Sequence, residues 1–337
     1  MIHYRPIAMT DAARPDAALP LAGGWCWFDR VEVLERGRAP VLVPATEVPT
    51  ASLQALTAPR AALAGLTLDR PRLMGILNVT PDSFSDGGRF LDPAAALAQG
   101  RAMAAAGADI LDIGGESTRP GAAEVAAADE IARTAPVIAA LRAGGAAGPI
   151  SIDTRKAAVA AAALAAGASM VNDVAAFSFD PEMVGVVARS AVPVCLMHAQ
   201  GTPATMQADP QYDDVVLDVY DFLAGRIAAA EAAGIARARI VVDPGIGFGK
   251  TQAHNLALIR GLALFHGLGC AIVLGASRKR FIGSIGGADQ AVERGPGSLA
   301  VALAAVAQGV QVLRVHDVAD TRQALALWQA VTAGDVT

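Results

Sequence analysis

The stretch PISIDTRKAAVAAAALAAGASMVNDV, residues 149–174, contains the unit from which the fold can be predicted. A short apolar run ends at Asp153, an alanine-rich segment over 156–166 stops at Gly167, and a second apolar run carries Asn172. The short runs have the length of buried strands and the longer segment that of a helix, while glycine accepts the left-handed backbone at a helix end. A strand, a helix and a strand in succession predict two parallel strands joined by a right-handed crossover.

The same unit repeats in both directions along the chain. Strand-like runs lie at 73–79, 109–115, 149–153, 169–174, 193–197, 239–245, 271–275 and 310–316. Helix-like segments lie at 92–106, 122–143, 156–166, 181–190, 213–233, 251–266, 297–308 and 318–332. Eight such units agree with the ~250 residues of a typical (β/α)8 TIM barrel. The sequence therefore predicts an α/β protein with this fold, and an open, doubly wound sheet is the competing architecture.

Polar residues mark the C-terminal ends of six of these runs. They are Asn78, Asp112, Asp153, Asn172, Asp243 and Arg314. Residues from six different strands meet on one face only if the sheet closes, and that face carries the active site in barrel enzymes. The pattern thus favours the barrel and predicts where its site lies.

Residues 1–70 differ from the rest of the chain because they are rich in proline. The aromatic segment WCWFDRVEVLER (25–36) has the pattern of a hairpin. We predict a loop-rich N-terminal extension over 1–70, packed on a barrel formed by 71–337.

Composition excludes several classes of protein. With 53% hydrophobic and 18% charged residues, the chain has enough apolar surface to fold. A formal net charge of −5 argues against general nucleic-acid binding. The alanine-rich run at 157–171 is too short to span a membrane, and the first residues lack the apolar core of a secretory signal. Three cysteines without a CxxC pair fit a reducing cytoplasm, where we expect the protein to act.

The loop NVTPDSFSDGGRF (78–90) follows the first strand and is long for a connection to a helix. Loops of this length and polarity are more often binding loops than spacers. Asn78 and Asp86 offer hard oxygen ligands suited to Mg²⁺ shared with a phosphate group. A solvated loop without a ligand is the alternative.

The segment DIGGESTRPGA (112–122) follows the second strand. Gly114 and Gly115 allow a ligand to approach the backbone closely. Arg119 presents a planar set of donors suited to phosphate or carboxylate. Alternatively, Glu116 and Arg119 form a local ion pair.

Asp153 and Asn172 stand at neighbouring strand ends. A carboxylate beside an amide can recognise a heterocycle that carries both donors and acceptors. Each could instead cap the helix that follows it. Met197 ends the fifth run, where it could offer an apolar face to a flat ring or simply belong to the core.

The segment VVDPGIGFGKT (241–251) resembles a Walker A loop. Pro244, however, occupies the position of the required first glycine, and proline has no N–H to bind phosphate. A P-loop NTPase is therefore disfavoured, and Asp243 becomes the group of interest. A buried carboxylate must find donors, and the adjacent N–H and NH₂ groups of guanine or pterin supply them.

Two basic segments follow the last two strands. LGASRKRFIG (274–283) places Lys279 near an expected helix start, and RVHDV places Arg314 and His316 at the end of the final strand. Both settings suit anions, and barrel enzymes often bind phosphate near these loops. A solvated basic turn and a structural histidine are the alternatives.

Taken together, these segments closely resemble the dihydropteroate synthase family of folate biosynthesis. The resemblance covers residues ~72 to ~332 and runs through NVTPDSFSDGG, GGESTRPG, IDT, VND, DPGIGFGK, SRK and RVHDV in order. It implies condensation of 6-hydroxymethyl-7,8-dihydropterin diphosphate with 4-aminobenzoate, giving 7,8-dihydropteroate and diphosphate by an SN1-like displacement. It also implies a Mg²⁺ cofactor, a homodimer and sensitivity to sulfonamides.

The resemblance further implies which residues bind each part of the substrates. The pterin site comprises Asp112, Asp153, Asn172, Asp243, Lys279 and Arg314, to which we add Met197. The diphosphate site comprises Asn78, Arg314 and His316, and Mg²⁺ bridges Asn78 and Asp86. The 4-aminobenzoate site comprises Phe84, Thr118, Arg119, Pro120 and Ser277. The expected catalytic residues are Asp153, Asp243, Lys279 and Arg314.

Two other functions compete with this interpretation. A corrinoid-type pterin-binding methyltransferase would share the Asp and Asn contacts to the ring, but it should lack the STRPG and SFSDGG loops. A non-catalytic pterin-binding protein would be favoured by the loss of Asn78, Arg119 or Lys279, and all three are present.

Overall fold

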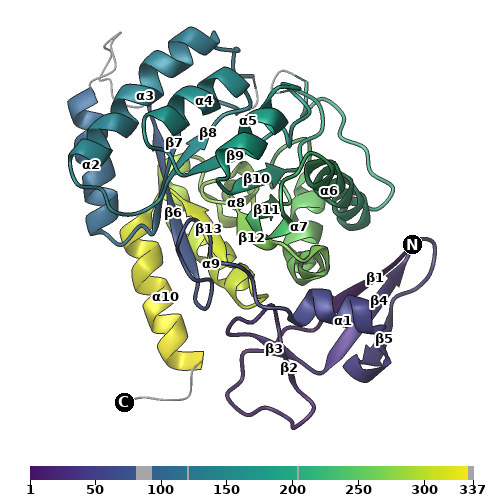
Figure 1. The fold of residues 1–337 in the computed structure, drawn as a ribbon. Coiled ribbons are helices and arrows are strands. Elements are labelled where there is room, and N and C mark those ends of the chain that lie inside the picture. The colour runs from purple at the N-terminus through teal and green to yellow at the C-terminus, as the bar shows by residue number, and fades with distance from the viewer. Residues whose placement is uncertain (81–92, 120, 203–204, 333–337) are drawn as a thin grey trace.

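Eight parallel strands close into a barrel, as the sequence predicts (Figure 1). The computed structural model describes residues 1–80, 93–119, 121–202 and 205–332. The barrel strands are β6 (Arg72–Asn78), β7 (Ile110–Gly114), β8 (Ile150–Asp153), β9 (Met170–Asp173), β10 (Val194–Met197), β11 (Ile240–Asp243), β12 (Ala271–Leu274) and β13 (Val312–Val315). Because β13 pairs with β6, with Val312 opposite Arg72, the open doubly wound sheet is excluded.

Helices follow the strands and surround the barrel (Figure 1). They are α2 (Pro93–Ala105), α3 (Ala127–Ala143), α4 (Ala157–Ala165), α5 (Met183–Ser190), α6 (Val215–Ala232), α7 (Gln252–Arg260), α8 (Arg280–Gly286), α9 (Gly295–Val306) and α10 (Val318–Thr332). Short 3-10 helices are η3 (Arg237–Arg239), η4 (Leu262–Leu268) and η5 (Ala291–Arg294). The helix predicted over 251–266 is thus two elements, α7 and η4. Among the described helices, none is both long and apolar enough to cross a membrane.

Strand residues alternate between two buried layers. Leu73 and Leu77 of β6 face outward and pack in the layer beneath the helices, whereas Met74 faces the barrel interior. This alternation follows from the two-residue period of a strand, and both faces are apolar because both are covered. Leu63 and Leu68, which precede β6, belong to the interior cluster. The linker therefore joins the packing inside the barrel.

The extension has its own small sheet and its own core. It contains β1 (Ile2–Pro6), β2 (Leu19–Pro20), β3 (Trp27–Phe28), β4 (Arg30–Glu35), β5 (Val41–Pro44), η1 (Ala45–Glu47) and α1 (Thr50–Thr57). Strands β1, β4 and β5 form an antiparallel sheet, and Phe28, Val31 and Leu56 pack together.

The hairpin predicted over 25–36 does not form. Its two halves are β3 and β4, and the single residue Asp29 between them cannot make a turn. Each half pairs with a different strand, β3 with β2 and β4 with β1 and β5. The connections that do reverse the chain are β2 to β3 and β4 to β5.

Hydrogen bonds and ion pairs fasten the extension to the barrel helices. The indole N–H of Trp25 donates to the carbonyl oxygen of Val306 at the end of α9, at 2.8 Å. Arg36 lies 2.6 Å from Asp218 and 2.7 Å from Asp221, both on α6. In Figure 1 the extension accordingly forms a lobe beside the barrel.

Candidate active site

Side chains from four strands meet across the mouth of the barrel. Arg314 on β13 donates from Nε to Asp112 on β7 at 2.5 Å, and from Nη2 to Asp153 on β8 at 2.6 Å. Asn172 on β9 donates to the same oxygen of Asp112 at 3.1 Å. We call this group, together with Asp243, the polar cup.

Asp243 opens into the same space as Arg314. The strand end at Gly275 separates them, and a Cβ atom on that glycine would lie 3.4 Å from Asp243 Oδ2 and 3.8 Å from Arg314 Cδ. The glycine therefore leaves room between the two side chains that a larger residue would occupy. Asp243 and Arg314 therefore lie in one cup, and the polar residues at the strand ends predict that these side chains meet.

Buried carboxylate oxygens in the cup lack partners. In the part of the chain that the structure describes, Oδ1 of Asp112 and Oδ1 of Asp153 are buried without a hydrogen-bond partner. Unpaired buried acceptors are costly and are rare in native structures. These two oxygens are therefore available as hydrogen-bond acceptors inside the cup.

Burial also perturbs the acidity of the cup. Burial raises the pKa of Asp153 to about 7, with Asp112 adding to the rise and Arg314 opposing it. Burial likewise raises the pKa of Asp243, although the N–H of Gly245, which donates to its Oδ1 at 2.7 Å, counteracts this. Carboxyl groups with raised pKa values at a strand-end cup are typical of functional sites.

Lys279 projects over the loop that follows β11. Its Nζ lies 4.0 Å from the centre of the Phe248 ring, a cation–π contact. Burial and then the charge of Arg314 lower the pKa of Lys279 to about 8, while Asp243 opposes the change. Phe248 is absent from the predicted site residues, although an aromatic residue inside an otherwise glycine-rich loop is a usable signal in the sequence.

His316 and Ser277 form a pair at the ends of β13 and β12. Ser277 Oγ accepts the backbone N–H of His316 at 3.3 Å and lies 3.0 Å from its Nδ1. Burial, followed by the charges of Arg278 and Arg314, lowers the pKa of His316 to about 3, so the ring is neutral. The contact between Oγ and Nδ1 fixes the orientation of the ring, and the ring tautomer decides which of the two atoms donates.

The basic turn after β12 is not a solvated cluster. Arg278 forms two hydrogen bonds with Asp317, one of them at 3.0 Å, and so is committed to an ion pair. Arg280 is exposed, which leaves Lys279 as the member of this turn that faces the cup.

The structure also decides two alternatives left open by the sequence. Glu116 pairs with Arg155 at 3.2 Å and with Lys156 at 3.0 Å, so it is not the partner of Arg119. The first N–H of α4 at Ala157 is accepted by Asp180 rather than by Asp153. Asp153 therefore belongs to the cup and is not a helix cap.

Comparison with known proteins agrees with this geometry. The family model described as pterin binding enzyme matches residues 74–316. The dihydropteroate synthase of Neisseria meningitidis serogroup C is 49% identical over 264 residues, covering 77% of this chain and 92% of that protein. That of Escherichia coli K12 is 45% identical over 258 residues, covering 77% and 90%. The chain belongs to the dihydropteroate synthase family.

Solved structures support the same conclusion. Xanthomonas albilineans dihydropteroate synthase with 4-aminobenzoic acid is 51% identical with a TM-score of 0.77, covering 82% of this chain and 99% of that one. The same enzyme in complex with 7,8-dihydropteroate gives 48% identity and a TM-score of 0.74, covering 82% and 100%. The whole extension, residues 1–70, lies before residue 74, where the family match begins.

Other predicted site residues of this family member lie around the cup. A Cβ atom on Gly114 would lie 3.6 Å both from Asn78 Oδ1 and from Asp153 Oδ2, so Asn78 borders the cup. Met197 is buried, pairs in register with Asp243, and lies beside the turn at Gly245.

The second loop lies at the edge of the described site. Thr118 is half-buried and Arg119 is exposed. The charge of Arg119 contributes to lowering the pKa of both Lys279 and His316, which places it near them. Phe84, Asp86 and Pro120 lie outside the described residues, so their assignments stay predictions.

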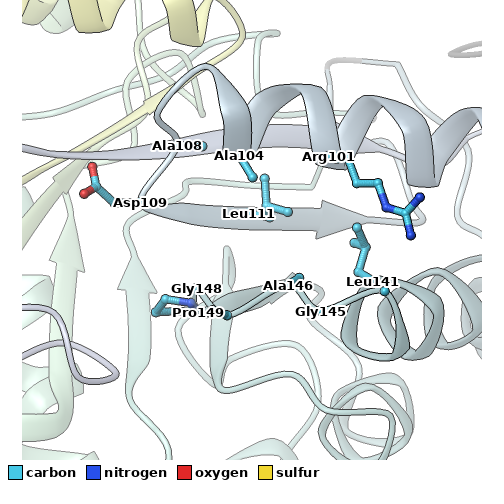
Figure 2. Close-up of a pocket in the computed structure, with 13 residues that line it drawn as sticks. Arg101, Ala104, Ala108, Asp109, Leu111, Leu141, Gly145, Ala146, Gly148 and Pro149 are labelled. Atoms are coloured by element: carbon cyan, nitrogen blue, oxygen red, sulfur yellow. The ribbon is translucent and has the colours of Figure 1, made fainter.

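A cavity of about 420 Å³ lies elsewhere, between α2 and α3 on the outside of the barrel. Figure 2 shows Arg101 and Leu141 at one end and Asp109 at the other. Asp109 precedes β7, at the opposite end of that strand from the cup. This cavity is therefore separate from the site that the polar residues form.

Proposed function

We propose that the polar cup binds the ring of 6-hydroxymethyl-7,8-dihydropterin diphosphate and that the groups around it bind the diphosphate and 4-aminobenzoate. As a member of the dihydropteroate synthase family, the chain is a transferase that joins these substrates to give 7,8-dihydropteroate and diphosphate. The observation that carries the proposal is the meeting of Asp112, Asp153 and Asp243 in one cup, with two buried oxygens left for a ligand.

Recognition of the ring follows from the donors and acceptors in the cup. The carboxylate of Asp243 accepts from adjacent N–H and NH₂ groups, as the edge of a pterin presents them. The NH₂ group of Asn172 donates to Asp112, so the side-chain carbonyl oxygen of Asn172 is left as an acceptor. Lys279 supplies a donor, and Met197 and the flat guanidinium group of Arg314 supply surfaces for the ring faces.

The diphosphate would lie where neutral and charged donors meet. His316 is oriented by Ser277, Arg314 is held by two carboxylates, and Asn78 borders the cup. Asp112 and Asp153 raise the pKa of Arg314 against the effect of its burial, so it stays charged. These donors stabilise charge on the leaving diphosphate.

The described side chains near the proposed diphosphate site can hold Mg²⁺ only if the substrate supplies further ligands. Within 1–80, 93–119, 121–202 and 205–332, no cluster of three or more His, Cys, Asp or Glu side chains could hold a metal ion by itself. The amide oxygen of Asn78 is one hard ligand, and we propose Asp86 as a second beside the phosphate oxygens. When bound, the ion would neutralise developing charge on the diphosphate.

The reaction proceeds by breaking the bond between the methylene carbon and the diphosphate oxygen, whose electron pair leaves with diphosphate. The resulting cation is delocalised into the dihydropterin ring, where the carboxylates of Asp153 and Asp243 stabilise it. The lone pair of the 4-aminobenzoate amine then forms the carbon–nitrogen bond, and the proton lost from that nitrogen passes to the released diphosphate. An arylamine is already nucleophilic, so this step needs no strong general base.

We propose that 4-aminobenzoate lies against the second loop, with its carboxylate near Arg119 and its ring near Phe84, Thr118, Pro120 and Ser277. Arg119 is exposed, and Glu116, the nearby carboxylate that could have paired with it, pairs with Arg155 and Lys156 instead. Sulfonamides that mimic 4-aminobenzoate should therefore compete with it. An inhibition curve without competition between the two would contradict this assignment.

The test of the proposed function is diphosphate release by the purified chain. Release should require 4-aminobenzoate and Mg²⁺ together, and 7,8-dihydropteroate should form in equal amount. Release that ignores 4-aminobenzoate, or methyl transfer from a folate, would overturn the proposal. We further propose a cytoplasmic homodimer, for which sedimentation of the full chain measures the oligomeric state.

A further inference from the structure

A buried lysine beside the cup has no part in the chemistry described above. Lys250 is 2% exposed, and its Nζ lies 2.8 Å from His198 Nδ1 and 3.0 Å from the carbonyl oxygen of Phe248. A third acceptor, the carbonyl oxygen of His198, lies at 3.4 Å. All three partners are neutral, and a lysine is rarely buried this deeply unless its amino group serves a purpose.

The contacts of Lys250 join two loops of the barrel. His198 directly follows β10, whereas Phe248 belongs to the turn of residues 244–249 that follows β11. The two loops touch elsewhere as well, since the N–H of His198 donates to the carbonyl oxygen of Asp243 at 3.0 Å. A Cβ atom on Gly245 would overlap the carbonyl oxygen of His198, so the backbones are in direct contact.

The turn 244–249 positions Asp243 of the cup and Lys279 beside it. At its start, the N–H of Gly245 holds the carboxylate of Asp243 at 2.7 Å. Near its end, the ring of Phe248 lies 4.0 Å from Nζ of Lys279. A shift of this turn would therefore move both the carboxylate and the surface on which the Lys279 amino group rests.

We propose that Lys250 is a positioning residue, which ties the turn 244–249 to His198 and so presents Asp243 and Lys279 to the pterin ring. The inference rests on the proposed pterin site. The two shorter hydrogen bonds can be made by a protonated or a neutral amino group, so the role does not depend on the charge of Lys250. Burial lowers the pKa of His198 to about 2, which keeps the ring neutral and able to accept.

Lys250→Met tests the proposal because methionine keeps most of the length of the side chain, being one atom shorter, and removes its donors. Tyr212→Phe is the matched control. The hydroxyl of Tyr212 donates to the carbonyl oxygen of Gly249 at 2.7 Å, so this change removes one tether of the same turn but keeps the contact to His198.

The separate KM values for dihydropterin diphosphate and for 4-aminobenzoate decide the outcome, and kcat and the unfolding midpoint are measured beside them to check that each variant is folded and active. Lys250→Met should raise the KM for the dihydropterin substrate at least tenfold and change the KM for the arylamine less than twofold. Tyr212→Phe should change each KM less than threefold. Calorimetry with 6-hydroxymethylpterin, which lacks the diphosphate, should show the same loss of ring affinity in Lys250→Met.

Equal rises of both KM values, or unchanged affinity for 6-hydroxymethylpterin in Lys250→Met, would overturn the proposal. If Lys250→Met does not fold, Lys250→Gln serves instead, because its amide keeps one donor for Phe248. It should weaken pterin binding selectively, and a parallel loss of both substrates would again contradict the role. Failure of the wild-type chain to bind 6-hydroxymethylpterin would instead refute the proposed function itself.

Discussion

Two aspartates at the two ends of β7 have opposite environments. Asp109, just before the strand, accepts the N–H of Leu73 at 2.8 Å and an Arg322 hydrogen bond at 2.5 Å on one oxygen. Its other oxygen lies 3.3 Å from both Arg70 and Arg72.

Asp112, three residues later, is buried with one oxygen shared by Arg314 and Asn172 and the other without a partner among the described residues. At the N-terminal end of β7, both oxygens of the aspartate therefore have partners, and we call this the satisfied end. At the C-terminal end, one oxygen of Asp112 has no partner among the described residues, and we call this the incomplete end. In barrel enzymes the N-terminal ends of the strands contribute to stability and the C-terminal ends carry the chemistry. Here a single strand, β7, shows both arrangements.

The largest expected effect concerns stability and falls on the satisfied end. Asp109→Ala leaves three arginines around an empty position, and breaking a buried charge network in this way costs about 3–5 kcal/mol. Urea unfolding measures the loss, while kcat of the folded protein should stay within twofold of wild type. Asp69→Ala is the control, because Asp69 is the exposed partner of Arg72. A small loss for Asp109→Ala would mean that the two ends do not differ as described.

The next effect concerns activity and falls on the incomplete end. Asp243→Asn replaces an acceptor by a group that presents its own donors to the N–H and NH₂ of the pterin. Loss of such a matched contact in a buried site lowers kcat/KM by about 10²–10³-fold. Stability should change little, because burial already disfavours the charged carboxylate. Near wild-type kinetics would show that the pterin lies elsewhere.

A third prediction concerns the pH dependence of stability. Burial lowers the pKa of Lys250 from 10.5 in the unfolded chain to about 7, with Asp243 opposing the shift. Between these values the unfolded chain binds one more proton, so raising the pH favours the folded state. The free energy of unfolding of wild type relative to Lys250→Met should rise by about 1.4 kcal/mol per pH unit across that window. A flat difference from about pH 7.5 to about pH 9.5 would show that Lys250 titrates normally.

The barrel could be predicted from the sequence because its evidence is local. Each strand is a short apolar run, six of the eight runs carry a polar residue at the C-terminal end, and repetition of the unit predicts the closed sheet. The partners in the cup could not be predicted, because Arg314 meets Asp112 across 202 positions of the chain. Ser277 pairs with His316, and Lys250 with His198, for the same reason. Closure of the barrel brings the strands that precede these residues side by side.

The extension was harder to predict for a different reason. Strands β2 and β3 have two residues each, which is too short for any periodic pattern. The change of partner at Asp29, from β2 to β1 and β5, depends on contacts with other strands rather than on local sequence. Aromatic and apolar residues there indicated a packed segment, and the pattern of pairing had to come from the structure.

The smallest expected effect concerns the ion pairs that attach the extension to the barrel. It tests whether they stabilise the fold as strongly as the ion pairs of Asp109. Arg36 makes ion pairs with Asp218 and Asp221, but its side chain is 39% exposed, and exposed pairs contribute about 0–1 kcal/mol. Arg36→Ala should therefore reduce stability slightly and leave kcat unchanged. The difference from wild type should shrink between about 0.1 M and 1 M salt, because salt screens exposed charges. Arg38→Ala is the control, since Arg38 pairs with Glu35 inside the extension. A salt-independent loss above about 2 kcal/mol for Arg36→Ala alone would contradict this prediction. It would mean that the Arg36 ion pairs contribute to stability as the buried ion pairs of Asp109 do.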